Sequence, residues 1–155
     1  MSKINLITMA GGLLRPADDE ASDRIRRWGV GNIVVGDFVR PRNYAFHKKF
    51  FALIEVAWEE WEPPESEYQG VQAHKSKERL REELIILAGY YDVCSSLKGD
   101  TRVIAKSISF ANMDEDEFGE LYNKVHQVIM DKILNDRRWQ PEDLDAAVDR
   151  VMNFL

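Results

Sequence analysis

Residues 43–61 read NYAFHKKFFALIEVAWEEW and contain the clearest helical repeat of the chain. Apolar side chains recur there at intervals of three and four residues, which places them on one face of an α-helix. These positions are Phe46, Phe50, Leu53, Ile54, Ala57, Trp58 and Trp61. The stretch therefore predicts a helix whose apolar face lies in the core, and Pro63 and Pro64 mark the break after it.

Other helices are predicted on both sides of this one, from the same spacing and from residues that favour helix ends. Their approximate ranges are 18–28, 75–88, 114–133 and 141–155. In the third of these, Asp114 is a favourable N-cap, because its carboxylate accepts hydrogen bonds from backbone N–H groups that have no partner within the helix. The acidic residues 115–117 lie in the first turn, where the helix dipole favours negative charge.

Short β-strands are predicted between the helices, at residues 3–9 and 32–39 and in a hairpin of residues 90–97 and 101–110. Arg102 and Lys106 fall on the same face of the second hairpin strand as Ile104, so this face is not simply apolar. Either a β-bulge shifts the register, or the face is a binding surface. The sequence leaves both alternatives open.

These elements predict an α+β fold, in which small antiparallel strands and a hairpin pack with about four to five helices. The chain has no strict alternation of strands and helices and no glycine-rich fingerprint, which argues against a nucleotide-binding doubly wound sheet. We expect residues 1–155 to form a single domain. Residues 62–76 are polar and rich in turn-forming residues, so we expect a mobile loop there.

The chain has 155 residues, of which 45% are hydrophobic and 31% charged, a composition typical of a soluble globular protein. No apolar run approaches the roughly 18 to 20 residues of a membrane span, so no membrane association is expected. The N-terminal residues lack the long apolar stretch and cleavage site of a secretory signal, which favours a cytoplasmic location.

Cysteine and histidine do not form the familiar patterns of metal or redox sites. Cys94 is the single cysteine, which excludes an internal disulfide and a cysteine-based zinc cluster. Because it lies in a predicted strand, we expect a buried, inert thiol. His47, His74 and His126 match no metal-ligand spacing. We therefore predict no cofactor, no metal site and no catalytic residue, and an enzymatic role is not favoured.

The formal net charge of −6 is unevenly distributed along the chain. Residues 1–107 hold 16 basic and 16 acidic side chains, whereas residues 108–155 hold 5 basic and 11 acidic ones. The excess of negative charge therefore belongs to the C-terminal third, and electrostatic arguments apply to the two parts separately.

The segment between Asp37 and Glu55 contains four basic residues and a histidine without any acid. Its basic side chains are suited to neutralise phosphates, and Tyr44, His47 or Phe51 offers a stacking surface, a combination used for single-stranded nucleic acid. With two residues of the hairpin, the predicted nucleic-acid-binding set is Arg40, Arg42, His47, Lys48, Lys49, Arg102 and Lys106. The competing interpretation is a solvated helix start whose aromatic rings belong to the core.

A run of acids opens the helix predicted to begin after residue 113, and it gives a second candidate surface. The predicted protein-interaction set is Asp114, Glu115, Asp116, Glu117 and Glu120. Helix capping explains the same acids without any partner. A metal-dependent nuclease is a further hypothesis, and it requires Asp37, Asp92, Asp100 and a histidine to meet in the fold.

Two strings of residues carry a resemblance to a known family. Residues 46–51 read FHKKFF, and residues 107–114 read SISFANMD. With them, most of the chain resembles a family of phage and prophage proteins of unknown function. The basic helix start is also similar to a segment of the NinB (lambda Orf) recombination mediators, which bind single-stranded DNA, although the Gln-Asn-Arg core of that segment is absent here.

The resemblance implies a phage-encoded protein that acts in the cytoplasm of an infected bacterial host, near replication or recombination. Together with the basic segment, it leads to our first hypothesis, a non-catalytic accessory protein of phage DNA metabolism that binds single-stranded nucleic acid. The alternative is a protein–protein inhibitor or adaptor, including an anti-defence factor, that binds a host protein through the acidic C-terminal third. Binding to oligonucleotides that is lost when Lys48 and Lys49 are replaced by Glu favours the first hypothesis.

Overall fold

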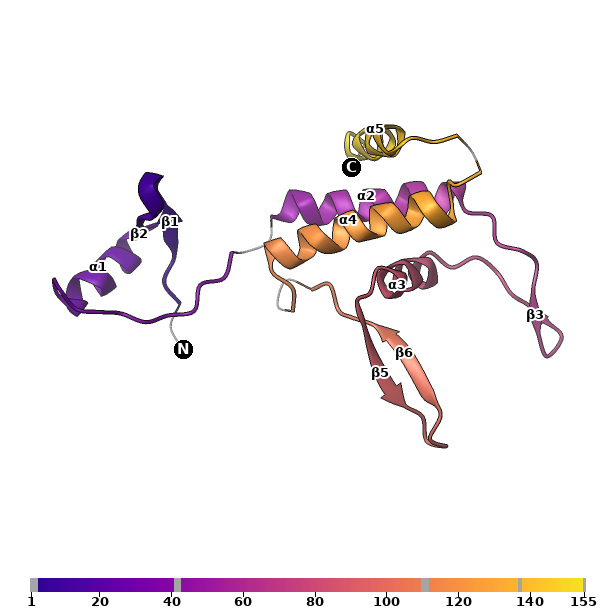
Figure 1. Cartoon of the computed structure of the whole chain (residues 1–155), viewed down its shortest axis with the longest axis horizontal. Coiled ribbons are helices and arrows are strands. Elements are labelled where there is room, and N and C mark those ends of the chain that lie inside the picture. Colours follow the sequence, from indigo (N-terminus) through magenta and orange to yellow (C-terminus); the bar gives the residue numbers. More distant parts are fainter. Residues whose placement is uncertain (1–2, 41–42, 110–111, 137, 155) are drawn as a thin grey trace. The chain divides into compact units, whose positions relative to one another are not determined.

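A computed structural model describes residues 3–40, 43–109, 112–136 and 138–154. The backbone divides into two compact units, Met1–Phe38 and Val39–Leu155, and each is considered by itself (Figure 1). The described residues form five α-helices and three antiparallel sheets of two strands each, which confirms the predicted α+β class. A single domain over the whole chain stays a prediction.

The N-terminal unit contains a short hairpin and one helix. Its elements are β1 (Leu6–Thr8), the 3-10 turn η1 (Ala10–Gly12), β2 (Leu14–Pro16) and α1 (Asp19–Trp28). Strands β1 and β2 pair antiparallel, and the turn between them uses Gly11 at a φ of 78°, a value that favours glycine. The Asp18 carboxylate accepts a hydrogen bond from the N–H of Ala21 at 2.7 Å, so Asp18 caps α1.

The strand predicted over residues 32–39 is wrong. The structure shows no strand in this segment, and Val35 is 93% exposed. Its Ile-Val-Val sequence has a high β-propensity, but a strand also needs a neighbour for its backbone hydrogen bonds. None of the described strands pairs with this segment, so the local signal was not sufficient.

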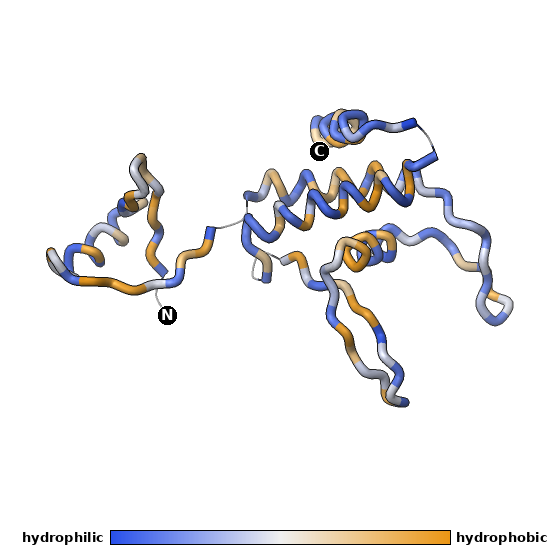
Figure 2. Tube along the Cα trace, viewed as in Figure 1, coloured by the Kyte–Doolittle hydropathy of each residue, from blue (hydrophilic) through white to orange (hydrophobic). Residues whose placement is uncertain are grey.

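The second unit is mainly helical. Its helices are α2 (Tyr44–Glu60), α3 (Lys77–Leu87), α4 (Glu115–Lys132) and α5 (Pro141–Met152). The side chain of Asn43 caps α2, and that of Asp114 caps α4 by accepting a hydrogen bond from the N–H of Glu117 at 2.9 Å. Hydrophobic and hydrophilic residues alternate along α2 and α4 (Figure 2), as expected for helices with one buried face.

The core of this unit is built from the apolar faces of all four helices. The large side chains that are fully buried are Phe50, Leu53, Ile54, Ile85, Phe118, Leu121, Val125, Ile129, Leu134, Leu144 and Val148. Most of the stripe predicted for residues 43–61 is thus confirmed. Phe46, Trp58 and Trp61 differ from the prediction because they are only partly buried and pack against the core from the first turn of α2, from its last turn and from its C-cap.

Helices α2 and α4 lie side by side and begin at the same end of the unit (Figure 1). The Glu115 carboxylate accepts a hydrogen bond from the N–H of Asn43 at 2.6 Å, and the Glu115 N–H donates to the Arg40 carbonyl at 3.3 Å. Near the start of each helix, the rings of Phe46 and Phe118 have centroids 5.2 Å apart. The two helices therefore run parallel, and the acids at the start of α4 lie near the positive dipole ends of both.

The predicted hairpin forms from β5 (Tyr91–Ser95) and β6 (Thr101–Ala105). Its register is regular over all five residue pairs, so the bulge alternative is wrong for these pairs. Both faces are exposed, with Val93 at 62% on one face and Ile104 at 46% on the other. Cys94 is exposed as well, so the expectation of a buried thiol is wrong, because this two-stranded sheet buries neither of its faces in the core.

The loop predicted over residues 62–76 contains a very short hairpin. Its strands are β3 (Glu67–Tyr68) and β4 (Val71–Gln72), and the turn residues Gln69 and Gly70 have φ values of 49° and 80°. The mobility expected for this loop stays a prediction.

Gly119 lies inside α4, where glycine is unfavourable because of its freedom in the unfolded chain. A Cβ atom added there would lie 3.8 Å from the Phe46 ring, an ordinary van der Waals contact. We expect Gly119→Ala to raise the free energy of unfolding by about 0.5 to 1 kcal/mol, measured by chemical denaturation. Gly70→Ala is the control, since alanine is strained at the φ of 80° there and should lower stability. A loss of stability in Gly119→Ala contradicts this packing of α2 against α4.

Candidate nucleic-acid interface

The first half of α2 carries a stripe of aromatic and basic side chains, which we call the α2 stripe: Tyr44, His47, Lys48 and Phe51. The rings of Tyr44 and His47 are nearly parallel, with centroids 6.5 Å apart, and the centroids of His47 and Phe51 are 4.9 Å apart. Lys48 Nζ lies 5.4 Å from the centre of the Tyr44 ring. Tyr44 is 64% exposed and Phe51 is 41% exposed, so solvent reaches both rings.

Lys49 lies on another side of α2, although it follows Lys48 directly. Its Nζ atom is 5.5 Å from the centre of the Tyr122 ring on α4. Lys49 also lines a cavity of about 540 Å³ together with Asp149 and Met152 of α5. Successive residues of an α-helix point in directions about 100° apart, so the two lysines cannot serve one surface equally.

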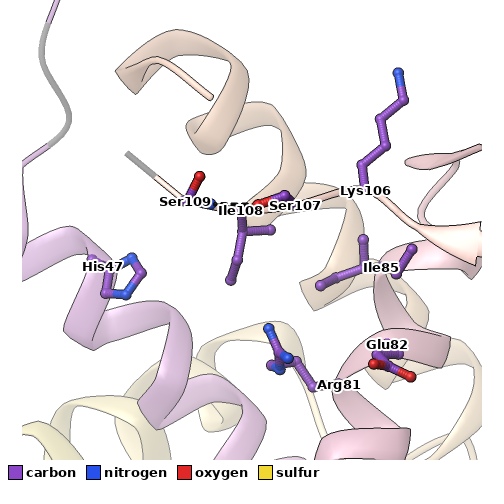
Figure 3. A pocket seen from close by; sticks show the side chains of 9 residues that line it. His47, Arg81, Glu82, Ile85, Lys106, Ser107, Ile108 and Ser109 are labelled. Atoms are coloured by element: carbon purple, nitrogen blue, oxygen red, sulfur yellow. Dashed lines mark hydrogen bonds between the residues drawn. The ribbon is translucent and has the colours of Figure 1, made fainter. Parts of the chain in front are cut away.

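A recess of about 500 Å³ lies between α2, α3 and the segment that follows β6. It is lined by His47, Arg81, Glu82, Ile85, Ala105, Lys106, Ser107, Ile108 and Ser109, and we call it the recess. Its apolar wall consists of Ile85 and Ile108, which are both buried. Figure 3 shows the His47 ring and the Arg81 side chain directed into the space beneath Ile108, whereas Lys106 points away from them.

The positive charge that faces the recess is that of Arg81, because Lys106 points away from it (Figure 3). Arg81 and Lys106 carry fixed positive charges, and Glu82 is the acid among the lining residues. The Arg81 side chain is only 21% exposed, and its guanidinium forms an ion pair with Glu78 one turn earlier on α3. Partial burial weakens solvent screening of this charge, and an anion must compete with the Glu78 carboxylate for the guanidinium, as it must with Asp116 for Arg40.

Two serine hydroxyls lie at the opposite wall of the recess, in the segment between β6 and α4. Ser107 Oγ accepts a hydrogen bond from the N–H of Ser109 at 3.3 Å, and Ser109 Oγ accepts one from the Asn112 amide at 2.9 Å. Both oxygens are acceptors in these bonds, which leaves each O–H group able to donate.

The recess joins the α2 stripe to one face of the hairpin. Arg102 and Ile104 lie on this face, and Lys106 continues it because its N–H donates to the Tyr90 carbonyl at 3.1 Å in the strand register. We call these three side chains the hairpin face. His47 belongs to both the α2 stripe and the recess, and Lys106 belongs to both the recess and the hairpin face. Shared residues therefore link the three parts.

The arginines predicted before α2 are placed less favourably for binding. Arg40 forms an exposed ion pair with Asp116 of α4, at 3.2 Å between Nη1 and Oδ1. A nucleic acid must compete with this carboxylate for the guanidinium, although exposed pairs of this kind are weak. Arg42 lies outside the described residues.

All five predicted acids lie at the start of α4, namely Asp114, Glu115, Asp116, Glu117 and Glu120. Asp114 is the N-cap, while Glu115 and Asp116 bind the backbone and side chain that precede α2. Glu120 accepts a hydrogen bond from the Tyr90 hydroxyl at 3.4 Å. Burial raises the pKa of Tyr90, and the Glu120 carboxylate adds to the rise. Capping by Asp114 is thus confirmed, and the protein-interaction set stays a prediction.

Comparison with known families covers nearly the whole chain. The DUF1367 family, described as proteins of unknown function, matches residues 1–69 and 65–154. The chain belongs to the DUF1367 family. Membership confirms the predicted relation to an uncharacterised family. The phage origin and the similarity to NinB stay predictions. No curated protein and no solved structure matches this DUF1367 protein.

Sequence reasoning missed Arg81 and the two serines of the recess in this DUF1367 protein. Arg81 belongs to the helix predicted over residues 75–88, where charged side chains are expected to face solvent. One signal indicates that Arg81 lies beside the core. It precedes the buried Ile85 by four residues and so lies on the same helical face. The serines had no such signal, since only the tertiary fold brings them opposite His47.

Two further observations concern sites of other kinds. Within residues 3–40, 43–109, 112–136 and 138–154, no three His, Cys, Asp or Glu side chains are grouped so that they can hold a metal ion. None of the described helices combines the length and the apolar character needed to cross a membrane.

Proposed function

We propose that this DUF1367 protein binds single-stranded nucleic acid as a non-catalytic accessory factor of phage DNA replication or recombination, in the cytoplasm of the bacterial host. The observation that supports the proposal is the continuity of the α2 stripe, the recess and the hairpin face. This surface combines exposed aromatic rings with basic side chains. Such a combination binds single strands of varied sequence, because every base has a face that stacks on an aromatic ring.

The α2 stripe supplies the stacking part of this interface. Tyr44 and Phe51 lie on either side of His47 along the helix, and both rings reach solvent. Stacking of a base on such a ring contributes roughly 1 to 3 kcal/mol. Lys48 lies beside Tyr44, where it can meet the phosphate next to a stacked base. A duplex keeps its bases stacked on one another, so we expect single strands to bind more tightly than double strands.

The hairpin face supplies further phosphate contacts. Arg102 and Lys106 lie two residues to either side of Ile104, on a hairpin whose backbone extends away from α3 and α4 (Figure 1). The net charge of the chain is −6, so the attraction of the protein for phosphates depends on these local basic groups and not on its overall charge. Binding is therefore expected to weaken steeply as salt is added.

The test is a fluorescence-anisotropy titration of labelled single- and double-stranded oligonucleotides at two salt concentrations. We expect Lys48→Glu/Arg102→Glu to weaken single-strand binding about ten- to hundred-fold at low salt. The slope of log affinity against log salt should also fall by about 1.4, because each phosphate contact with a single strand contributes about 0.7.

Lys49→Glu/Arg150→Glu is the matched control. It changes the net charge equally, but Lys49 lies beside Tyr122 and Arg150 lies in the last turn of α5. This variant should bind nearly as well as the parent. Equal weakening by both variants, or binding that does not respond to salt, contradicts the proposed surface. If the parent binds no strand, the proposal is rejected and the host-protein alternative is tested next.

A further inference from the structure

We infer that the recess holds the terminal phosphate of the bound strand, an inference that rests on the proposed function. The α2 stripe and the hairpin face both border the recess, through His47 and Lys106. A strand that follows this surface therefore passes the mouth of the recess. Its occupant is then decided by the shape and chemistry of the lining residues.

The shape of the recess favours the end of a strand over its middle. Ile85 and Ile108 form a buried apolar wall, so a chain that enters cannot continue past them. The occupant must be a group that enters from the mouth and stops there. In a nucleic acid, this group is either a terminal phosphate or a base turned out of the strand.

The chemistry of the lining selects the phosphate. Arg81 presents a planar set of N–H donors that matches phosphate oxygens, and its side chain is directed into the recess with the His47 ring (Figure 3). Ser107 and Ser109 line the opposite wall of the recess. A phosphate monoester carries nearly two negative charges at neutral pH, whereas a phosphodiester within the strand carries one. The partly buried Arg81 guanidinium therefore attracts the phosphate at the strand end more strongly than a phosphodiester within the strand.

The test uses one short single-stranded sequence in three forms, with a phosphate at one end, at the other end, or at neither. We expect the protein to bind one phosphorylated form about ten-fold more tightly than the unphosphorylated form, as one charge-assisted bidentate contact allows. Arg81→Gln should remove this preference, so that the variant binds the phosphorylated and unphosphorylated strands with equal affinity.

Arg79→Gln is the matched control, because Arg79 lies on the same helix but is exposed and pairs with Glu83. This variant should keep the preference for the phosphorylated strand. Circular dichroism and thermal unfolding of both variants establish that each is folded. A preference that survives in Arg81→Gln overturns the assignment of the phosphate to the recess.

The outcomes separate this inference from the proposed function. Equal binding of all three forms overturns the inference and leaves the proposed function intact, whereas no binding of any form overturns the proposed function. Competition by inorganic phosphate and by a nucleoside monophosphate distinguishes the sources of the phosphate. If either of them binds in an Arg81-dependent way and no strand binds, the recess takes a free phosphate compound and the inference about strands is overturned.

Discussion

Phe118→Ala should lower the free energy of unfolding by about 3 to 5 kcal/mol, the usual cost of removing a phenyl ring from a protein core. The Phe118 side chain is fully buried in α4. Its ring centroid lies 5.2 Å from that of Phe46 and 5.5 Å from that of Phe50, both on α2. Phe118 therefore lies within a cluster of rings between the two parallel helices, to which Tyr122 and His47 also belong, and the variant leaves a cavity there.

Chemical denaturation, followed by far-ultraviolet circular dichroism, measures this loss. Phe51→Ala is a suitable comparison, because Phe51 is also a phenylalanine near the start of α2 but its ring reaches solvent. We expect it to cost about 1 to 2 kcal/mol, since a residue that is 41% exposed loses less buried area than Phe118 does. A Phe118→Ala variant as stable as Phe51→Ala would show that α4 does not pack on α2 through these rings.

Tyr122→Phe should remove a loss of stability at alkaline pH. Burial raises the pKa of the Tyr122 phenol above its ordinary value of 10.0, and the carboxylates of Asp145 and Asp149 on α5 add to the rise. Above about pH 10 the unfolded chain releases this proton while the folded chain keeps it, so stability falls as the pH rises toward the folded pKa. Below pH 10 the phenol is neutral in both states and this loss is absent.

The pH dependence of unfolding measures this effect. Above pH 10, the parent should lose up to about 1.4 kcal/mol per pH unit relative to Tyr122→Phe. At neutral pH the two should have similar stabilities, because the Tyr122 hydroxyl makes no hydrogen bond with any described residue. Tyr44→Phe removes a hydroxyl from an exposed ring and serves as the control. We expect its stability to fall with pH above pH 10 as steeply as that of the parent. Identical alkaline slopes for parent and Tyr122→Phe contradict burial of the phenol.

The helices of this protein were predictable because their signals are local. The apolar spacing within residues 43–61 and the caps at Asp18 and Asp114 each depend on residues a few positions apart. The prediction of a strand over residues 32–39 was wrong because the formation of a strand is not decided locally. Its side chains favour β-structure, but a strand exists only where another strand accepts its hydrogen bonds, and sequence spacing does not say where that is.

The candidate site was predictable in part for the same reason. Tyr44, His47 and Phe51 were proposed as a stacking surface, and the structure places them on one side of α2. Lys48 and Lys49 both belong to the predicted binding set because they lie in the segment without acids, and the helical rotation separates them. These two outcomes follow from helix geometry alone.

The remaining features of the site depend on contacts between distant segments. Arg40 was predicted to bind phosphates, but the fold brings Asp116 to within 3.2 Å of it. Arg81 gains its position in the recess only because α3 packs near α2 and near the segment after β6. No spacing along the chain encodes these distances, so a set chosen from composition alone contained Arg40 and omitted Arg81.

The parallel course of α2 and α4 has a consequence for how the protein folds. Two antiparallel helices can be joined by a short turn, whereas parallel neighbours require the chain to return to its starting end. Here Asn43 and Glu115 meet although they are 72 positions apart in the sequence, and the returning chain contains α3 and the β5–β6 hairpin. Closure of so long a loop is entropically unfavourable until the contacts between helices form. The α2–α4 contact is therefore non-local, and a chain rich in helices is expected to fold at the slower rates of mixed α/β proteins.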